Sequence, residues 1–170
     1  SMFDYLANRG FTGSIGNGLL VAGTTSTLTT TVTIFPVLDG KYGTALTAIT
    51  NQAHPTTDYN TGLTPVAMVG GNSVANTPGQ GCVGVYGLVA GVVKYVQGPI
   101  AALDMQGSFK WDAPQFPPIP ANFIPFNYTV MKAGATAATS IIVGTTAWSA
   151  TGFTQAFVNV CQLPSRPAVS

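Results

Sequence analysis

His54 is the one residue from which a hydrolytic triad could be built, because the chain has no other histidine. The Gly-x-Ser-x-Gly motif that presents a nucleophilic serine in many hydrolases is absent from the sequence. His54 precedes Pro55 in the polar, turn-rich stretch 51–62. We therefore expect His54 to be a solvent-exposed loop residue without a catalytic role.

Carboxylates are almost as scarce, since the chain has five aspartates and no glutamate. A glycosidase needs two carboxyl groups at a set separation. Here only Asp4, Asp39, Asp58, Asp104 and Asp112 could supply them. Asp39 and Asp104 stand in turn signatures, where aspartate bonds to its own backbone. A glycan-acting hydrolase using Asp104 or Asp112 is thus the third alternative, and a Ca²⁺ site built from loop carbonyls and one or two aspartates stays open.

Cys82 and Cys161 are the only cysteines. We expect two buried, reduced thiols, because free cysteine is among the most buried residue types; one long-range disulfide is the alternative. Neither cysteine has metal-ligand spacing, and no cofactor is predicted. Asn127-Tyr128-Thr129 matches the glycosylation sequon. Because Ser1-Met2-Phe3-Asp4 has no signal-peptide character, we expect that match to be a coincidence.

Aromatic side chains could form a platform on which sugars stack. Such residues more often fill a core or anchor a protein interface, and we expect one of those two roles here. The residues concerned are Trp111, Trp148, Phe109, Phe116, Phe123, Phe126 and Phe153.

The composition excludes several classes of protein. Charged residues make up 6% of the chain, against roughly 25% in an average soluble domain. Helix surfaces normally use the charged and long polar residues that are missing, so the abundance of Thr and Gly favours strands and turns. The six basic residues are spread from Arg9 to Arg166, which argues against nucleic-acid binding. The apolar stretches are too short for membrane helices. A nearly neutral surface favours association with other protein.

Period-2 alternation and turn signals predict an all-β domain, an antiparallel sandwich or barrel of jelly-roll type. The segment 113–120 contains four prolines and is expected to be an extended chain that crosses between sheets or lies in a groove. Turns are expected at Asp39-Gly40 and at Asp104 to Gly107, and a hairpin around Ala90-Gly91. The expected strands are Thr24 to Pro36, Leu63 to Val69, Cys82 to Leu88, Val92 to Gln97, Phe126 to Lys132, Thr139 to Val143 and Phe153 to Gln162, with Thr44 to Thr50 as either a strand or a helical turn.

Residues 1–23 are rich in glycine and irregular, so they are expected to form an N-terminal arm that docks on a partner, with residues 24–170 as a single β domain. The arm and the stiff proline-rich segments are the expected contact regions. The candidate interface residues are Phe3, Tyr5, Leu6, Arg9, Phe11, Phe116, Ile119, Trp148 and Arg166.

The last 40% of the chain carries a distinctive set of short motifs. They are Leu103-Asp104-x-x-Gly107-x-Phe109, Ala113-Pro114-Gln115-Phe116-Pro117-x-Ile119-Pro120, Tyr128-x-x-x-Lys132-x-Gly134, Trp148-x-Ala150-Thr151-Gly152 and Leu163-Pro164-x-Arg166-Pro167. This region resembles a group of small structural proteins of tailed bacteriophages.

The resemblance implies a non-enzymatic virion component, a capsid decoration (cement) protein made in the bacterial cytoplasm. Its expected partners are the major capsid protein or other virion subunits, with neither nucleic acid nor membrane. Self-association into a homo-oligomer, with a trimer favoured, is expected as well. A fibre, tail or receptor-binding module of the same kind of particle is the alternative.

Overall fold

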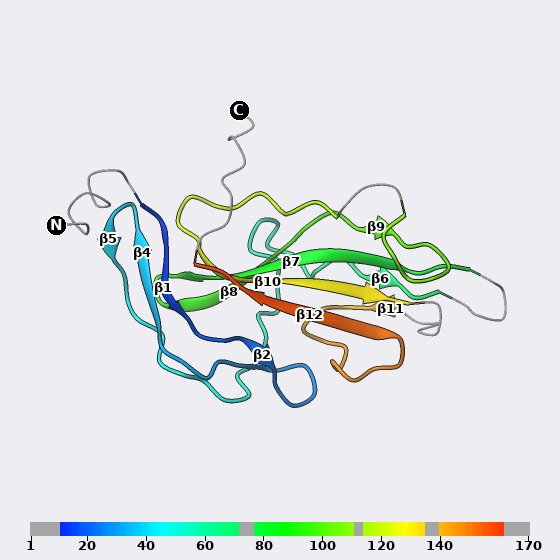
Figure 1. Cartoon of the computed structure of the whole chain (residues 1–170), viewed down its shortest axis with the longest axis horizontal. Helices are drawn as coiled ribbons and strands as arrows, with labels where there is room; N and C mark the ends of the chain where they lie inside the picture. Colours follow the sequence, from blue (N-terminus) through cyan, green and yellow to red (C-terminus); the bar gives the residue numbers. More distant parts are fainter. Residues whose placement is uncertain (1–10, 72–76, 111–113, 135–139, 162–170) are drawn as a thin grey trace.

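The computed structural model describes residues 11–71, 77–110, 114–134 and 140–161. These residues form strands and turns without a helix, which confirms the all-β prediction, and the strands pack as a sandwich-like body. Figure 1 shows the long strands side by side along the body, with a smaller sheet across one end. The strands are β1 (Gly13–Asn17), β2 (Val21–Ala22), β3 (Leu28–Thr29), β4 (Ile34–Leu38), β5 (Lys41–Tyr42), β6 (Met68–Val69), β7 (Gln80–Val89), β8 (Val92–Gln97), β9 (Ala101–Ala102), β10 (Ile124–Ala133), β11 (Ser140–Ile141) and β12 (Phe153–Asn159).

The main sheet is antiparallel in the order β12-β10-β7-β8, with β9 pairing to the start of β7. The expected hairpin is confirmed: Val89 pairs with Val92 across the two-residue turn Ala90-Gly91, and both turn residues have positive φ. This is the geometry of a type I′ turn, whose twist matches that of the strands. Smaller antiparallel pairs, β2 with β3 and β6 with β11, extend the body.

Both faces of β7 are covered. One face, with Cys82, Tyr86 and Leu88, belongs to the larger hydrophobic core. The other face, with Val85, packs in a second cluster that includes Phe123. Side chains alternate between the two faces of a strand, so the nearly continuous apolar run of β7 reflects burial on both sides.

The proline-rich segment is extended, as expected, but it does not cross between sheets: it lies between β9 and β10, two strands of the same main sheet, and covers the second face of β7. Residues 114–120 are outside any strand and lead to β10. The Phe116 ring packs edge-on against Tyr128 of β10, with 5.1 Å between ring centroids. Asn60 donates a hydrogen bond from Nδ2 to the Pro118 carbonyl. An extended chain without strand partners is thus held by ring packing and a side-chain hydrogen bond.

The prediction that residues 1–23 form an N-terminal arm is wrong for residues 11–23. β1 pairs with β4, and Ser14 N donates to the Cys161 carbonyl. Leu20 is fully buried in the main core. Glycine at positions 16 and 18 provides the positive φ angles that let this segment turn back into the body. Residues 1–10 lie outside the described residues.

Several expected strands are shorter than the alternation suggested, and two of them show why. Within 24–36, only Leu28–Thr29 and Ile34–Leu38 form strands. The backbone between these two strands forms hydrogen bonds with other segments: Thr30 N donates to the Ile49 carbonyl, and Val32 N donates to the Gly18 carbonyl. Within 63–69, only Met68–Val69 is a strand. The alternation indicated which residues are buried better than where the hydrogen-bonded ladder runs.

Replacing Gly87 by alanine should destabilise the protein, because a Cβ there would collide with the Phe123 ring on the second face of β7. We expect a loss of about 1–3 kcal/mol in the free energy of unfolding, typical of overpacking. Gly134→Ala is the matched control, since its added Cβ would lie 3.5 Å from its nearest neighbour, the Gly152 carbonyl oxygen. Urea unfolding of the three proteins measures both changes, and equal midpoints for the two variants would contradict the close packing at Gly87.

Candidate interaction surface

His54 is buried, which corrects the expectation of an exposed loop residue. Its Nδ1 lies 2.8 Å from the Pro55 carbonyl oxygen and its Nε2 lies 2.7 Å from the Tyr86 hydroxyl. Because a carbonyl only accepts, Nδ1 carries the proton and donates, and the Tyr86 hydroxyl donates to Nε2. Loop 51–62 therefore folds inward at this point, although most of its residues are exposed.

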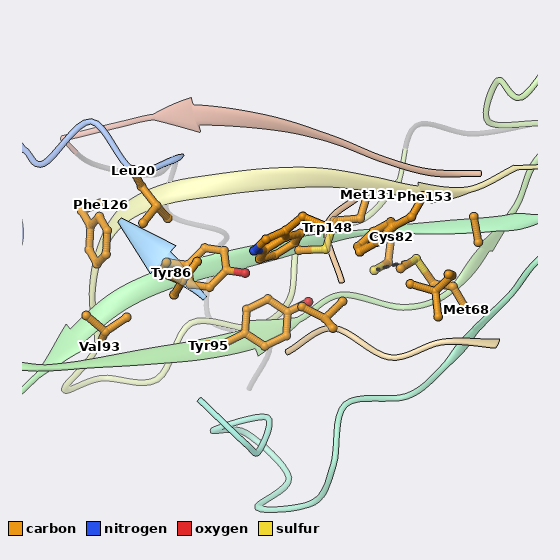
Figure 2. Packing of buried hydrophobic residues seen from close by; sticks show 14 of the residues in the cluster. Leu20, Met68, Cys82, Tyr86, Val93, Tyr95, Phe126, Met131, Trp148 and Phe153 are labelled. Carbon is orange, nitrogen blue, oxygen red and sulfur yellow. Dashed lines mark hydrogen bonds between the residues drawn. The ribbon is translucent and has the colours of Figure 1, made fainter. Parts of the chain in front are cut away.

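Aromatic rings surround this histidine. Tyr86 and Tyr95 meet it edge-on, and Trp148 lies 6.0 Å away between ring centroids; Figure 2 shows these three rings together in the core. Burial lowers the pKa of His54 to about 4, and the hydrogen bond to Pro55 opposes that effect only in part. Both ring nitrogens already have protein partners, so this neutral histidine joins the loop to β7.

The aspartates are spread over separate turns. Asp104 caps its own turn, accepting hydrogen bonds at Oδ1 from the backbone N–H groups of Gln106 and Ser108, as its turn signature predicts. Asp58 is buried and accepts at Oδ1 from Asn60 N. Asp4 and Asp112 lie outside the described residues. Within the described ranges, no three His, Cys, Asp or Glu residues cluster closely enough to hold a metal ion.

The structure bears on the predictions for the two cysteines and for the glycosylation sequon. Cys82 and Cys161 are both free, so the structure holds no disulfide between them. Cys82 is buried, and burial raises its pKa to about 12, whereas Cys161 is exposed and departs from the expectation of two buried thiols. Asn127 of the sequon is completely buried and donates to Asn159. A buried asparagine cannot accept a glycan on the folded protein.

The aromatic residues are mainly core, which leaves the sugar platform without support from those that the structure describes. Phe123, Phe126 and Phe153 are buried. Trp148 is also buried, stacked on Phe153, and its Nε1 donates to the Thr27 carbonyl 2.7 Å away. Trp148 is therefore a core residue and the expectation that it forms an interface is wrong. Trp111 lies outside the described residues.

The remaining interface candidates have mixed positions. Phe11 and Phe116 are half-buried. Ile119 is exposed. The other candidates, Phe3, Tyr5, Leu6, Arg9 and Arg166, lie outside the described residues.

The most exposed large apolar side chains of the N-terminal sheet lie on one side of it. The sheet has the order β1-β4-β5, with Ile15 opposite Phe35 and Val37 opposite Tyr42. Because Phe35 and Val37 are two residues apart, Ile15, Phe35 and Tyr42 point to the same side. Their exposed fractions are 48%, 49% and 62%. We call these three residues the N-terminal apolar face.

The opposite side of this sheet is closed. Ser14 and Pro36 are register partners and both are buried, as is Ile34 at the start of β4. β1 and β4 also contact β10 of the main sheet on this side. One side of the N-terminal sheet thus belongs to the core. The other side is exposed at Ile15, Phe35 and Tyr42 but closed at Val37, which is 2% exposed.

Sequence reasoning missed this face. The alternation in residues 24–36 predicts that Ile34 faces the core. Its neighbour Phe35, an isolated aromatic residue, is then predicted to face solvent. A large apolar residue at a strand position that is predicted to face solvent was the sequence signal that could have revealed this face. Leu19 and Val32 are also exposed, and the backbone N–H of Val32 donates to the Gly18 carbonyl.

No family model, no curated protein and no solved structure matches this chain. The described part of the chain contains no helix with the length and apolar character required to span a bilayer.

Acidification should weaken the fold through His54. The unfolded chain binds a proton near pH 6.5, whereas the folded chain resists protonation until about pH 4. The free energy of unfolding should therefore fall as the pH drops from 6.5 to 4, by on the order of 3 kcal/mol at about 1.4 kcal/mol per pKa unit. Denaturant unfolding across this range measures the slope. His54→Gln should flatten it, and an unchanged slope in that variant would assign the effect to other groups.

Proposed function

We propose that this chain is a non-enzymatic structural subunit that works by protein–protein contact, in the virion of a tailed bacteriophage, where it decorates and stabilises the capsid. The observation that carries the proposal is the N-terminal apolar face on a chain with 6% charged residues. Exposed apolar surface that is not needed for a protein's own core is typical of sites where another protein binds. The assignment to a phage particle comes from the sequence resemblance.

The groups that a hydrolase would use support the structural role rather than the enzymatic one. His54 has both ring nitrogens committed to Pro55 and Tyr86. Asp104 is committed to its own turn. A general acid or base must reach substrate, and a buried histidine and a turn-capping carboxylate are poorly placed to do so.

Sparse charge also suits assembly on a lattice. Few charges means little desolvation cost when the surface is covered, and each contact can be modest because the lattice repeats it. The contact partner in this proposal is the major capsid protein or another virion subunit, and self-association into a homo-oligomer is part of it.

An add-back experiment tests the virion role. Particles that lack the protein are incubated with the purified chain and sedimented, and heads and tails are then separated. We expect the chain to co-sediment with heads and to raise their resistance to heat or chelators. Recovery with tails alone would favour the fibre or tail alternative, and absence from both fractions would refute a virion role.

Two variants connect that result to the N-terminal apolar face. Phe35→Asp places a charge on the face and should abolish incorporation. Leu63→Asp is the control, because Leu63 is even more exposed (69%) and lies in a loop outside the N-terminal sheet. Thermal unfolding checks that both variants fold. Equal incorporation of the two would show that the face takes no part.

A further inference from the structure

β12 forms one edge of the main sheet, beside β10 (Figure 1). At the two ends of their pairing, Gly134 N donates to the Gly152 carbonyl and Val160 N donates to the Phe126 carbonyl. In an antiparallel pair only alternate residues exchange hydrogen bonds with a given neighbour, so the even-numbered residues of β12 bond to β10. The backbone N–H and C=O groups of its odd-numbered residues point to the other side, away from the sheet.

Three successive odd-numbered residues of β12 have no backbone hydrogen bond to any described part of the chain. They are Gln155, Phe157 and Asn159. The free stretch ends on both sides at a bonded residue, because Phe153 N donates to the Ala150 carbonyl and the Cys161 carbonyl accepts from Ser14 N. The unpaired backbone groups are therefore placed symmetrically about Phe157.

The opposite edge of the main sheet, at β8, is covered by the chain itself. Tyr59 N donates to the Tyr95 carbonyl, and Gln97 N donates to the Asp58 carboxylate. The loop that follows His54 thus occupies the backbone groups of β8 that point outward. The fold closes one edge of its main sheet and leaves part of the other edge unpaired.

β12 also lacks the features that usually keep an edge strand from pairing. Such strands are protected by charged side chains, by proline or by a bulge. The seven residues Phe153–Asn159 include neither a charged residue nor a proline, and their pairing with β10 has no register shift. A regular, uncharged edge of this kind is a template for one more strand.

We propose that β12 pairs antiparallel with β12 of a second copy of this chain, around a twofold axis at Phe157. In a twofold contact each residue pair occurs twice with the roles exchanged. Phe157 then lies opposite Phe157 of the second copy, and Gln155 lies opposite Asn159. Each of these pairs exchanges two N–H···O bonds, so every unpaired backbone group of the stretch gains a partner. The inference deepens the proposed function, because it names the surface for the self-association included there.

The symmetry of the free stretch favours a second copy over a strand from a different protein. Where a foreign strand is added to a sheet edge, its specificity comes from side-chain pockets or from opposite charges, and β12 offers no charge. In the twofold pairing Ala156, which is exposed, lies opposite Val158 of the second copy. A small residue opposite a β-branched one suits the closer spacing of a pair without hydrogen bonds.

The first experiment uses the unaltered full chain. We expect light scattering at micromolar concentrations to give the mass of a dimer. In the dimer the odd-numbered amides of β12 should exchange hydrogen at least about tenfold more slowly than after dilution to monomer, as read by NMR. The even-numbered amides, bonded to β10, are the internal control and should be protected at both concentrations. A dimer whose odd-numbered amides stay unprotected would overturn the pairing.

A proline substitution tests the backbone bonds. Gln155→Pro removes an outward N–H without disturbing the bonds to β10, and proline is tolerated at such edge positions. Gln155→Ala is the matched control, because both variants lose the side-chain hydrogen bonds to the carbonyls of Trp148 and Phe153. We expect the proline variant to dimerise at least about tenfold more weakly than the alanine variant. Thermal unfolding checks that both fold, and equal dimer affinities would count against the proposal.

A disulfide between copies tests the register. In a Cys161→Ser background, Ala156→Cys and Val158→Cys proteins are mixed in a glutathione redox buffer. The twofold register brings these two positions within disulfide distance across the axis, whereas like positions are diagonal neighbours about 7–8 Å apart. We expect the mixture to form a covalent dimer with one copy of each and the separate variants to form little. No excess of the mixed dimer would exclude a twofold axis at Phe157.

The pairing and the virion role can fail separately. A wild-type monomer or trimer would exclude the twofold pairing. Incorporation into particles is measured with the same proteins. A monomer that still enters particles would leave the virion role standing, whereas a stable dimer that binds no particle would leave the pairing standing alone.

Discussion

The burial of β7 on both faces is the constraint on which the rest of this fold depends. Its neighbours β10 and β8 pair with it along the edges, while the histidine-centred core and the proline-rich segment close its two faces. Large rings pack directly onto the strand because two positions carry no side chain: Tyr95 lies against Gly84 and Phe123 against Gly87. Glycine in a central strand is costly, but here it leaves room for rings that bury far more apolar area.

Such a closed interior requires every polar group inside it to have a partner. Tyr86 donates to His54, and Tyr95 donates to Gln97, which in turn donates to the Val66 carbonyl. In the described ranges, no buried side-chain nitrogen or oxygen lacks a hydrogen-bond partner. The same bonds hold the His54 ring and the Tyr86 hydroxyl between protein partners inside the core. The N-terminal apolar face, by contrast, lies on the surface.

The exposed apolar side chains of the N-terminal sheet give a physical reason for the scarcity of charged residues. A sheet that packs one side on the core and keeps apolar side chains on the other is unfavourable for an isolated soluble protein. It becomes favourable when that side is covered by protein, and a surface with few ions loses little hydration when covered. The proposed virion role rests in part on this property.

Local sequence patterns predicted the fold class, the β7–β8 hairpin, the turns at Asp39 and Asp104 and the extended course of the proline-rich segment, but not the face that this segment covers. Each of these predictions depends on local rules: side-chain alternation, the φ angles of Gly and Pro, and backbone capping by aspartate. The packing of distant segments places His54 and Trp148 in the core, brings residues 13–22 into the body and leaves Phe35 exposed. Burial depends on which distant segments meet, as when Trp148 bonds to Thr27 across 121 residues, and local sequence carries little information about such encounters.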